Sequence, residues 1–348
     1  MMVQSELSGE RVRSKPPLSG RTDPFEREKV LTMQIQRVAC IGAGLIGQGW
    51  ATIFAAKGFD VILHDIDPTV LREALRVIRE NIAFLEESGF LKKGARAPFR
   101  DRIETTTNLA EAIQAADYVQ ESVYDDYPIK KKVFEEMDTV APESAILASS
   151  ASGLLMTEIQ RVTKRPERCV LVHPILPVHL IPVVEIVGGE KTSAESVEAA
   201  CALMQRLGKT PILLKREVPG YIVNRLQAAL LREAIDLVAK GVATVEDVDR
   251  AFCMGIGLRD PFLGPFMRIH LVANGVERFK ERYAQSYHYR WSSMDTWTEI
   301  PPGAFEEIVA GTKAMEKART KTVAEITAWR DDMLVRLIKL LKEDGSNG

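Results

Sequence analysis

Among the histidines, His173 stands where a catalytic base would be expected. It follows an apolar run, residues 169–172, that predicts a buried strand. Ligands of open α/β sheets bind beyond the carboxyl ends of the strands, which places His173 at such a site. Glu185 lies 12 residues further on in an otherwise apolar run, where a carboxylate is costly unless it has a partner. We expect Glu185 to orient the His173 imidazole and to stabilise the imidazolium formed when His173 takes up a proton.

A second constellation is glycine-rich and predicts a cofactor site. Gly42-Ala43-Gly44-Leu45-Ile46-Gly47 lies between an apolar strand and a helix, and Asp65 ends the next predicted strand. This is the context of a dinucleotide-binding turn, in which Gly42 makes the turn, Gly44 admits the pyrophosphate and Gly47 allows close helix–strand packing. The Asp65 carboxylate would accept hydrogen bonds from the ribose and repel a 2′-phosphate. The sequence therefore predicts NAD rather than NADP, with Asp65 as a simple helix cap as the alternative.

A serine-rich segment, Ser149-Ser150-Ala151-Ser152, follows another predicted strand. Its hydroxyls are placed to contact a substrate oxygen or the nicotinamide side of a cofactor. A serine-rich helix entry is an equally good interpretation of this segment.

The elements that must position these residues alternate between strands and helices from residue 34 to 217. This alternation predicts a parallel, doubly wound Rossmann-type sheet. After Gly220 the pattern becomes helical, so residues 218–348 are predicted to form an all-α second domain. Residues 1–33 mix Ser, Gly, Pro and both charges without an apolar period, which predicts a flexible tail. The expected strands are 37–41, 60–64, 117–120, 145–148, 169–172, 183–187 and 211–214, and the later expected helices are 221–240, 265–283, 303–318 and 321–342.

Composition excludes several classes of protein. The 348 residues carry a formal net charge of −2, so no basic field is available for nucleic acid or an anionic membrane. No apolar run has the length of a membrane span. The four cysteines are scattered without CxxC spacing, which argues against a disulfide framework and against a metal site. We expect a cytoplasmic globular protein.

Several motifs together resemble the 3-hydroxyacyl-CoA dehydrogenase superfamily, most closely its L-gulonate 3-dehydrogenase, or lambda-crystallin-like, branch. The resemblance runs from about Arg37 to the C-terminus. It is carried by GAGLIGQGWA (42–51), YVQESV (118–123), SSASGL (149–154), HPILPVHLIPVVEIV (173–187), REVPGYIVNRLQ (216–227), GIGLRDPFLGP (255–265) and AWRDDMLVRL (328–337).

The resemblance implies roles for individual residues. Ser152, His173 and Asn224 match the catalytic set of the family, and Glu185 matches its histidine-orienting acid. Glu121 resembles the glutamate on the nicotinamide side. Lys130 resembles a lysine near the cofactor, although as one of three adjacent lysines it also fits a solvated helix face. Arg259 is suited either to holding a substrate carboxylate or to bracing a subunit interface.

Two positions bear on the substrate that the resemblance implies. Trp50 is typical of the branch that acts on free acids, whereas Leu176 stands where the family usually has Asn, so a polar substrate contact is absent. The expected reaction is NAD-dependent oxidation of the 3-hydroxyl of a small, L-gulonate-like hydroxy acid.

Other functions stay open at this point. A 3-hydroxyacyl-CoA substrate is one alternative. Carnitine is another, and its trimethylammonium group would need an aromatic cage, for which Tyr124, Tyr127 and Trp291 are available. A non-enzymatic, crystallin-like NADH-binding role is a third. The family resemblance also implies a homodimer formed through the C-terminal helices.

Overall fold

The computed structural model describes residues 35–92 and 102–343. The predicted tail, residues 1–33, lies outside these ranges. Within the described residues, eight strands form one sheet in the order β3-β2-β1-β4-β5-β6-β7-β8. The strands are β1 (Arg37–Ile41), β2 (Asp60–His64), β3 (Ile103–Thr106), β4 (Tyr118–Glu121), β5 (Ile146–Ser149), β6 (Cys169–Pro174), β7 (Val183–Gly188) and β8 (Thr210–Leu213).

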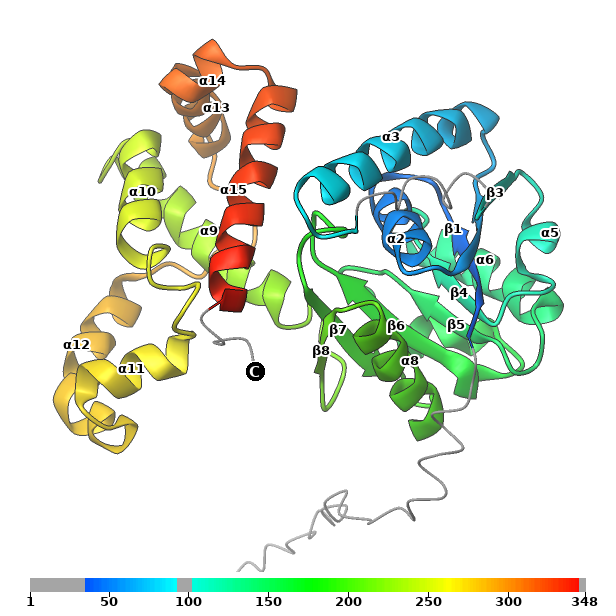
Figure 1. The fold of residues 1–348 in the computed structure, drawn as a ribbon. Helices are drawn as coiled ribbons and strands as arrows, with labels where there is room; N and C mark the ends of the chain where they lie inside the picture. The colour runs from blue at the N-terminus through cyan, green and yellow to red at the C-terminus, as the bar shows by residue number, and fades with distance from the viewer. Residues whose placement is uncertain (1–34, 93–101, 344–348) are drawn as a thin grey trace, which may run out of the picture. The chain divides into compact units, whose positions relative to one another are not determined.

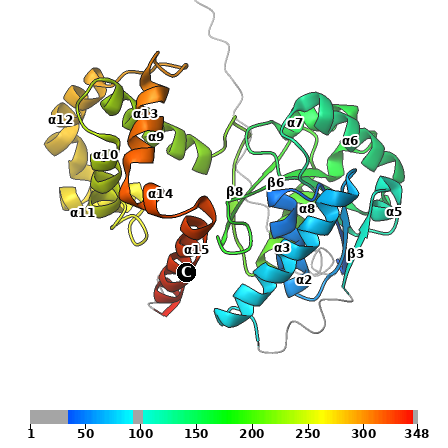
Figure 2. The same ribbon diagram turned by 90° about the horizontal axis from the view of Figure 1, so that it is seen from above.

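Helices cover both faces of this sheet, as expected for a doubly wound fold (Figure 1). On one face, apolar residues of α2, α3 and α8 pack around Trp50 and Phe54. On the other face, α5, α6 and α7 bury Phe134 and Met137. Figure 2 shows the same layers from above. These helices are α2 (Leu45–Ala56), α3 (Pro68–Glu87), α5 (Leu109–Ile113), α6 (Tyr127–Val140), α7 (Met156–Ile159) and α8 (Ala194–Arg206), with two 3-10 turns, η1 (Gln160–Val162) and η2 (Pro166–Arg168).

Two strands, β7 and β8, correct the expectation of a fully parallel sheet. β7 runs antiparallel to β6, whereas β8 is parallel to β7. Only residues 175–182 connect β6 to β7, and a parallel neighbour would need a crossover of about a dozen residues or more. The short connection therefore brings β7 back beside β6 in the opposite direction, and this pairs His173 with Glu185 in register.

The described chain after β8 is mainly helical, as predicted, and Thr244 caps α10 by accepting from the Asp247 N–H. The expected helix 265–283 is wrong, because Asn274 adopts a left-handed conformation and Gly275 has a φ of 116°. The elements are α9 (Val223–Ala239), α10 (Val245–Ala251), a π-helical turn η3 (Phe252–Ile256), α11 (Pro265–Ala273), η4 (Val276–Arg278), α12 (Phe279–Ser293), α13 (Ala304–Ala314), α14 (Glu316–Thr320) and α15 (Val323–Glu343). No helix in the described ranges is long and apolar enough to cross a membrane.

The carboxyl ends of the central strands lie next to one another. The register pairs Ile41 of β1 with Glu121 of β4, and Glu121 with Ser149 of β5. β6 continues this edge, because Ser149 pairs with Leu171, two residues before His173. The glycine-rich turn, the serine-rich segment and His173 therefore share one edge of the sheet.

Candidate active site

The glycine-rich turn has the geometry that a dinucleotide requires. Gly42 has a φ of 93°, and a Cβ added there would lie 2.8 Å from the Ser122 carbonyl oxygen. A Cβ on Gly47 would lie 1.8 Å from the Gly42 carbonyl oxygen, so the start of α2 can approach the turn only with glycine at this position. Apart from Gly44 itself and its chain neighbours, no atom of the described residues lies within 4 Å of a Cβ placed on Gly44. That open side is where the expected pyrophosphate would need to approach the backbone.

The surroundings of the turn also fit NAD. Gly44 precedes α2 and provides no side-chain cap, so the first N–H groups of α2 are free to bind an anion. Asp65 accepts hydrogen bonds from the N–H groups of Ala43, at 2.9 Å, and Asp67, at 3.1 Å. Asp67, not Asp65, caps α3, which removes the helix-cap interpretation of Asp65. Leu45 and Ile66 are 68% and 86% exposed beside the turn, although both are large and apolar.

His173 and Glu185 form the predicted pair. Nδ1 of His173 lies 2.8 Å from Oε2 of Glu185, and both side chains are buried. The second carboxylate oxygen of Glu185 accepts the N–H groups of Ile222, at 2.8 Å, and Val223, at 3.0 Å. Burial alone would raise the pKa of Glu185, but the hydrogen bonds from His173, Val223 and Ile222 outweigh burial and lower it. Glu185 therefore stays ionised and connects the imidazole to the start of α9.

Tyr221, directly before α9, completes the surroundings of His173. Its ring centroid lies 5.2 Å from that of the imidazole, and its hydroxyl donates to the Leu154 carbonyl oxygen. Tyr221 is fully buried with a φ of 49°, a conformation that is uncommon for a residue with a side chain. Sequence reasoning did not identify Tyr221, because neither its type nor its spacing marks it.

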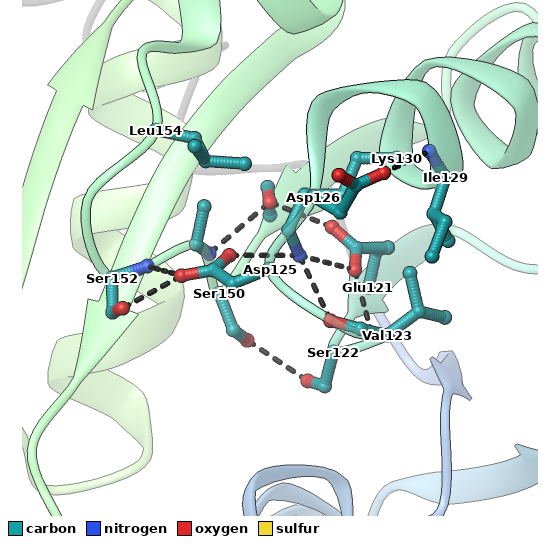
Figure 3. Close-up of polar contacts among 12 residues, drawn as sticks. Glu121, Ser122, Val123, Asp125, Asp126, Ile129, Lys130, Ser150, Ser152 and Leu154 are labelled. Atoms are coloured by element: carbon teal, nitrogen blue, oxygen red, sulfur yellow. Dashed lines mark hydrogen bonds and ion pairs between the residues drawn. The ribbon is translucent and has the colours of Figure 1, made fainter.

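Glu121 and Lys130 form a second buried pair, shown in Figure 3. Nζ of Lys130 lies 2.7 Å from Oε1 of Glu121 and 3.1 Å from the Val123 carbonyl oxygen, and the lysine side chain is 1% exposed. The interpretation of Lys130 as part of a solvated face is therefore wrong. The hydroxyl of Ser149 donates to the other oxygen of Glu121 at 2.6 Å. The pair is thus fixed between β4, β5 and α6.

Ser152 is held by Asp125 and Asn224. Its N–H and its hydroxyl both donate to Oδ2 of Asp125, at 2.8 and 2.6 Å, and its carbonyl oxygen accepts from Nδ2 of Asn224 at 3.0 Å. The other oxygen of Asp125 lies 3.4 Å from Nζ of Lys130, so this group adjoins the Glu121 pair (Figure 3). The sequence-based reasoning missed Asp125, although an acidic residue just after a strand of the sheet was an available signal.

Residues 222–224 bring the two groups together. The N–H groups of Ile222 and Val223 bind Glu185, and the next side chain, Asn224, binds Ser152. The four residues proposed as catalytic from the sequence are therefore connected through the start of a single helix. An ionisable imidazole and side-chain amide and hydroxyl groups beside a dinucleotide turn can support proton transfer coupled to hydride transfer.

Other residues considered from the sequence are not brought to this group. The Arg259 side chain is exposed and makes no hydrogen bond or ion pair within residues 35–92 and 102–343. Tyr124, Tyr127 and Trp291 make no ring contact with one another among the described residues. Trp291 instead packs on Tyr287 of its own helix, with ring centroids 5.0 Å apart. Leu176 is 46% exposed beyond the end of β6.

Comparison with known proteins agrees with this geometry. The model of the 3-hydroxyacyl-CoA dehydrogenase NAD-binding domain matches residues 37–218, and that of the C-terminal domain of the same enzymes matches residues 220–302. The chain is 36% identical over 311 residues to an L-carnitine dehydrogenase of Oceanobacillus iheyensis, covering 89% of this chain and 99% of that protein. It is 33% identical over 307 residues to the lambda-crystallin of Oryctolagus cuniculus, covering 88% and 96%.

A solved structure is similar along most of its length. It is that of 5-formyl-3-hydroxy-2-methylpyridine 4-carboxylic acid 5-dehydrogenase, described as an NAD+-dependent dismutase. The TM-score is 0.77 at 28% identity, covering 88% of this chain and 99% of that one. With two matched domain models and a cofactor turn that fits NAD, the chain belongs to the 3-hydroxyacyl-CoA dehydrogenase family and is an NAD-dependent oxidoreductase that acts on CH–OH groups.

Proposed function

We propose that the protein oxidises the 3-hydroxyl of a small, L-gulonate-like free hydroxy acid to the 3-keto acid. The observation that carries this proposal is the buried His173–Glu185 pair at the sheet edge that also holds the dinucleotide turn. NAD, when bound to the turn, supplies the hydride acceptor. Gly42, Gly44, Gly47 and Asp65 would hold its pyrophosphate and ribose, with the backbone of Leu45 and Ile46 at the helix N-terminus.

His173 is the base in this proposal. Its Nδ1 donates to Glu185, so Nε2 is the nitrogen left to accept the substrate hydroxyl proton. The ionised Glu185 stabilises the imidazolium that results. Glu121 and Lys130 line the nicotinamide side, where their pairing leaves little uncompensated charge.

Ser152 and Asn224 contribute differently to substrate binding. The Ser152 hydroxyl proton is directed to Asp125, so its oxygen presents lone pairs to a ligand. Asn224 uses one Nδ2 hydrogen on Ser152 and keeps the second. We therefore assign to Asn224 the hydrogen bond to the carbonyl oxygen that forms.

Three observations support a free acid rather than a thioester. Two of the similar proteins described above have names that specify small molecules, carnitine and a pyridine carboxylic acid. Trp50 is the residue that resembles the free-acid branch. The exposed Arg259 is uncommitted and suited to a carboxylate, with an interface role as the alternative.

L-Carnitine is the second candidate, because the Oceanobacillus relative bears that activity in its name. Its trimethylammonium group would need contacts other than a joint cage of Tyr124, Tyr127 and Trp291. It therefore ranks below an L-gulonate-like acid.

We further propose a homodimer formed through the helices after residue 218. Many large apolar side chains in this part of the chain are exposed, among them Phe266, Leu271 and Trp291 at 80%, 58% and 64%. Where exposed apolar side chains form one contiguous patch, the surface is typical of an interaction site. A cytoplasmic location stays a prediction from composition.

Initial rates of NADH formation test the proposed function. Purified protein and NAD would be supplied in parallel with L-gulonate, L-carnitine, free 3-hydroxybutyrate and 3-hydroxybutyryl-CoA. We expect turnover of a free acid, with L-gulonate ahead of L-carnitine. Turnover of the thioester alone would contradict the free-acid assignment, and NADH binding without turnover of any compound would favour the crystallin-like role.

A further inference from the structure

A network of buried polar side chains ends beside the dinucleotide turn. It starts at Tyr118 and passes through Gln120 to Ser150, where the indole of Trp50 joins it. Ser150 then contacts Ser122, with the two hydroxyl oxygens 2.9 Å apart. Tyr118, Gln120 and Trp50 are fully buried. Because so few alternative partners exist here, the direction of each hydrogen bond can be determined.

Tyr118 fixes the orientation of Gln120. Burial raises the pKa of the Tyr118 phenol well above its usual value, so the phenol keeps its proton. Its hydrogen-bond partner is Oε1 of Gln120, at 2.7 Å. The Gln120 amide nitrogen must therefore face the opposite way, toward Ser150 at 2.8 Å and the Val172 carbonyl oxygen at 3.4 Å.

Ser150 consequently accepts two hydrogen bonds. One comes from the amide nitrogen of Gln120 and the other from Nε1 of Trp50, at 3.1 Å, and both groups act only as donors. A serine hydroxyl has two acceptor lone pairs and one proton. With both lone pairs used, the Ser150 proton is left for its remaining partner, the Ser122 oxygen (Figure 3).

Ser122 therefore accepts from Ser150 and has a proton of its own left to donate. Within the described ranges, no other hydrogen bond of the Ser122 hydroxyl is formed. The residue borders the dinucleotide turn: its N–H donates to the Ile41 carbonyl oxygen at 2.7 Å, and its Cβ lies 3.8 Å from a Cβ placed on Gly47. Its side chain is partly exposed.

We propose that Ser122 is a cofactor-binding residue whose hydroxyl donates a hydrogen bond to an oxygen of bound NAD, either in the pyrophosphate or in a ribose. Trp50 is a positioning residue that acts through Ser150. By occupying a lone pair of Ser150, the indole prevents Ser122 from donating inward and keeps its proton available to the cofactor. This inference rests on NAD binding and is independent of the substrate proposed above.

Fluorescence titration with NADH tests the role of Ser122 without requiring turnover. We expect Ser122→Ala to weaken NADH binding three- to tenfold, about the worth of one neutral hydrogen bond, and Ser122→Cys, with its weaker donor, to lie in between. Ser196→Ala, in α8 and outside the site, serves as the matched control and leaves NADH affinity within twofold of wild type. An NADH affinity of Ser122→Ala within twofold of wild type would overturn the proposal.

Fragments of the cofactor distinguish the two sources of the acceptor oxygen. ADP contains the pyrophosphate, and ADP-ribose adds the second ribose. If Ser122→Ala weakens both fragments, the acceptor lies in ADP, and if it weakens only ADP-ribose, the acceptor is in the second ribose. Either result supports the proposal, whereas unchanged binding of both fragments and of NADH contradicts it.

A double-mutant cycle tests the role of Trp50. Trp50→Phe frees a lone pair of Ser150, to which Ser122 can then donate, so NADH binding weakens by no more than in Ser122→Ala. In the Ser122→Ala background, Trp50→Phe causes no further loss. If the loss of NADH affinity in the double variant equals the product of the two single losses, Trp50 acts independently of Ser122. Should Trp50→Phe not fold, Ser150→Ala replaces it: that change leaves the Ser122 proton free, so retained NADH affinity supports the relay and a three- to tenfold loss overturns it.

Discussion

The sheet region and the helical region differ in the kind of energetically costly side chain that they contain: buried charged groups in the first, exposed apolar groups in the second. In the described part of the sheet region, residues 35–92 and 102–217, three buried charged groups have an oppositely charged partner: Lys130 with Glu121, Arg168 with Asp138 and His173 with Glu185. A fourth, Lys209, donates to the carbonyl oxygens of Val178 and Ile181. In the helical region, residues 218–343, large apolar side chains stay in solvent. Examples are Leu226, Leu231, Met254, Phe266, Leu271, Trp291 and Leu340.

This contrast separates two requirements for function: the groups that carry out the chemistry and the surface that associates with a partner. The sheet region completes its own core and holds both the cofactor turn and the base, so its integrity is decided within one chain. The helical region supplies Asn224 and the N–H groups that fix Glu185, but leaves apolar surface uncovered. We infer that the first region sets the chemistry and that the second is completed by a second copy of the chain.

The largest effect is expected from removing a charge inside the sheet region. Lys130→Met leaves the carboxylate of Glu121 buried and unpaired, which costs about 3–5 kcal/mol in the free energy of unfolding. Lys132→Met, at an exposed position of the same helix, changes it by about 0.5 kcal/mol or less. Urea unfolding of both variants measures the difference. Equal stabilities would show that the sheet region does not depend on this pair.

The next prediction concerns the helical region. Sedimentation should give about twice the chain mass of 38.8 kDa, and Phe266→Asp with Leu271→Asp should release monomers. Burying one such side chain is worth about 1.5–3 kcal/mol, so two charges should weaken association more than a hundredfold. Ile66→Asp, equally exposed but in the sheet region, should leave the mass unchanged. A wild-type chain that sediments as a monomer would contradict the contrast between the regions.

Substitutions at two glycines of the sheet region should affect folding and cofactor binding separately. Gly44→Ala places a methyl group in space that the described residues leave open, so stability is unchanged while NADH binding weakens at least about tenfold, or 1.4 kcal/mol. Gly47→Ala forces a methyl group against the Gly42 carbonyl oxygen and lowers the thermal unfolding midpoint. Calorimetry and NADH titration on both variants check this. If Gly44→Ala binds NADH as tightly as wild type does, the pyrophosphate does not approach the backbone at Gly44.

The smallest effect depends on pH. The pKa of Glu185 is lowered from 4.5 in the fold, so its ionised form stabilises the native state above that value. This stability is lost as pH falls through the lowered pKa. Wild type should therefore be more stable than Glu185→Gln at pH 7, and the gap should narrow as pH falls through the lowered pKa of Glu185. Urea unfolding at pH 7, 5 and 3.5 tests the sign, and a gap that widens in acid would contradict it.

Much of the fold was accessible from the sequence because local signals agreed with the final structure. The run 37–41, the glycine turn and Asp65 lie within 29 residues of one another and mark one βαβ unit, β1-α2-β2. β3 (Ile103–Thr106) was missed because three of the four residues of this short edge strand are polar and it has no apolar period. The break in the expected helix 265–283 had a signal, the Asn274-Gly275 pair, in which both residues adopt positive φ.

The candidate site was less accessible, since several of its contacts join distant segments. Asp125 reaches Ser152 across 27 residues, and Asn224 reaches it across 72. The burial of Lys130 goes with its ion pair to Glu121, nine residues earlier in the chain, which no pattern in three adjacent lysines indicates. The antiparallel β7 depended on the length of a connection, and it alone explains why Glu185 faces His173.

The most direct test of the account compares two readouts on one variant, His173→Gln. If His173 is the base at a site separate from the cofactor turn, the rate of NADH formation from the preferred free acid falls about 10²–10⁴-fold while the dissociation constant for NADH stays within twofold of wild type. A variant that loses NADH binding together with turnover, or one that keeps its turnover, would contradict the assignment of His173 as the catalytic base.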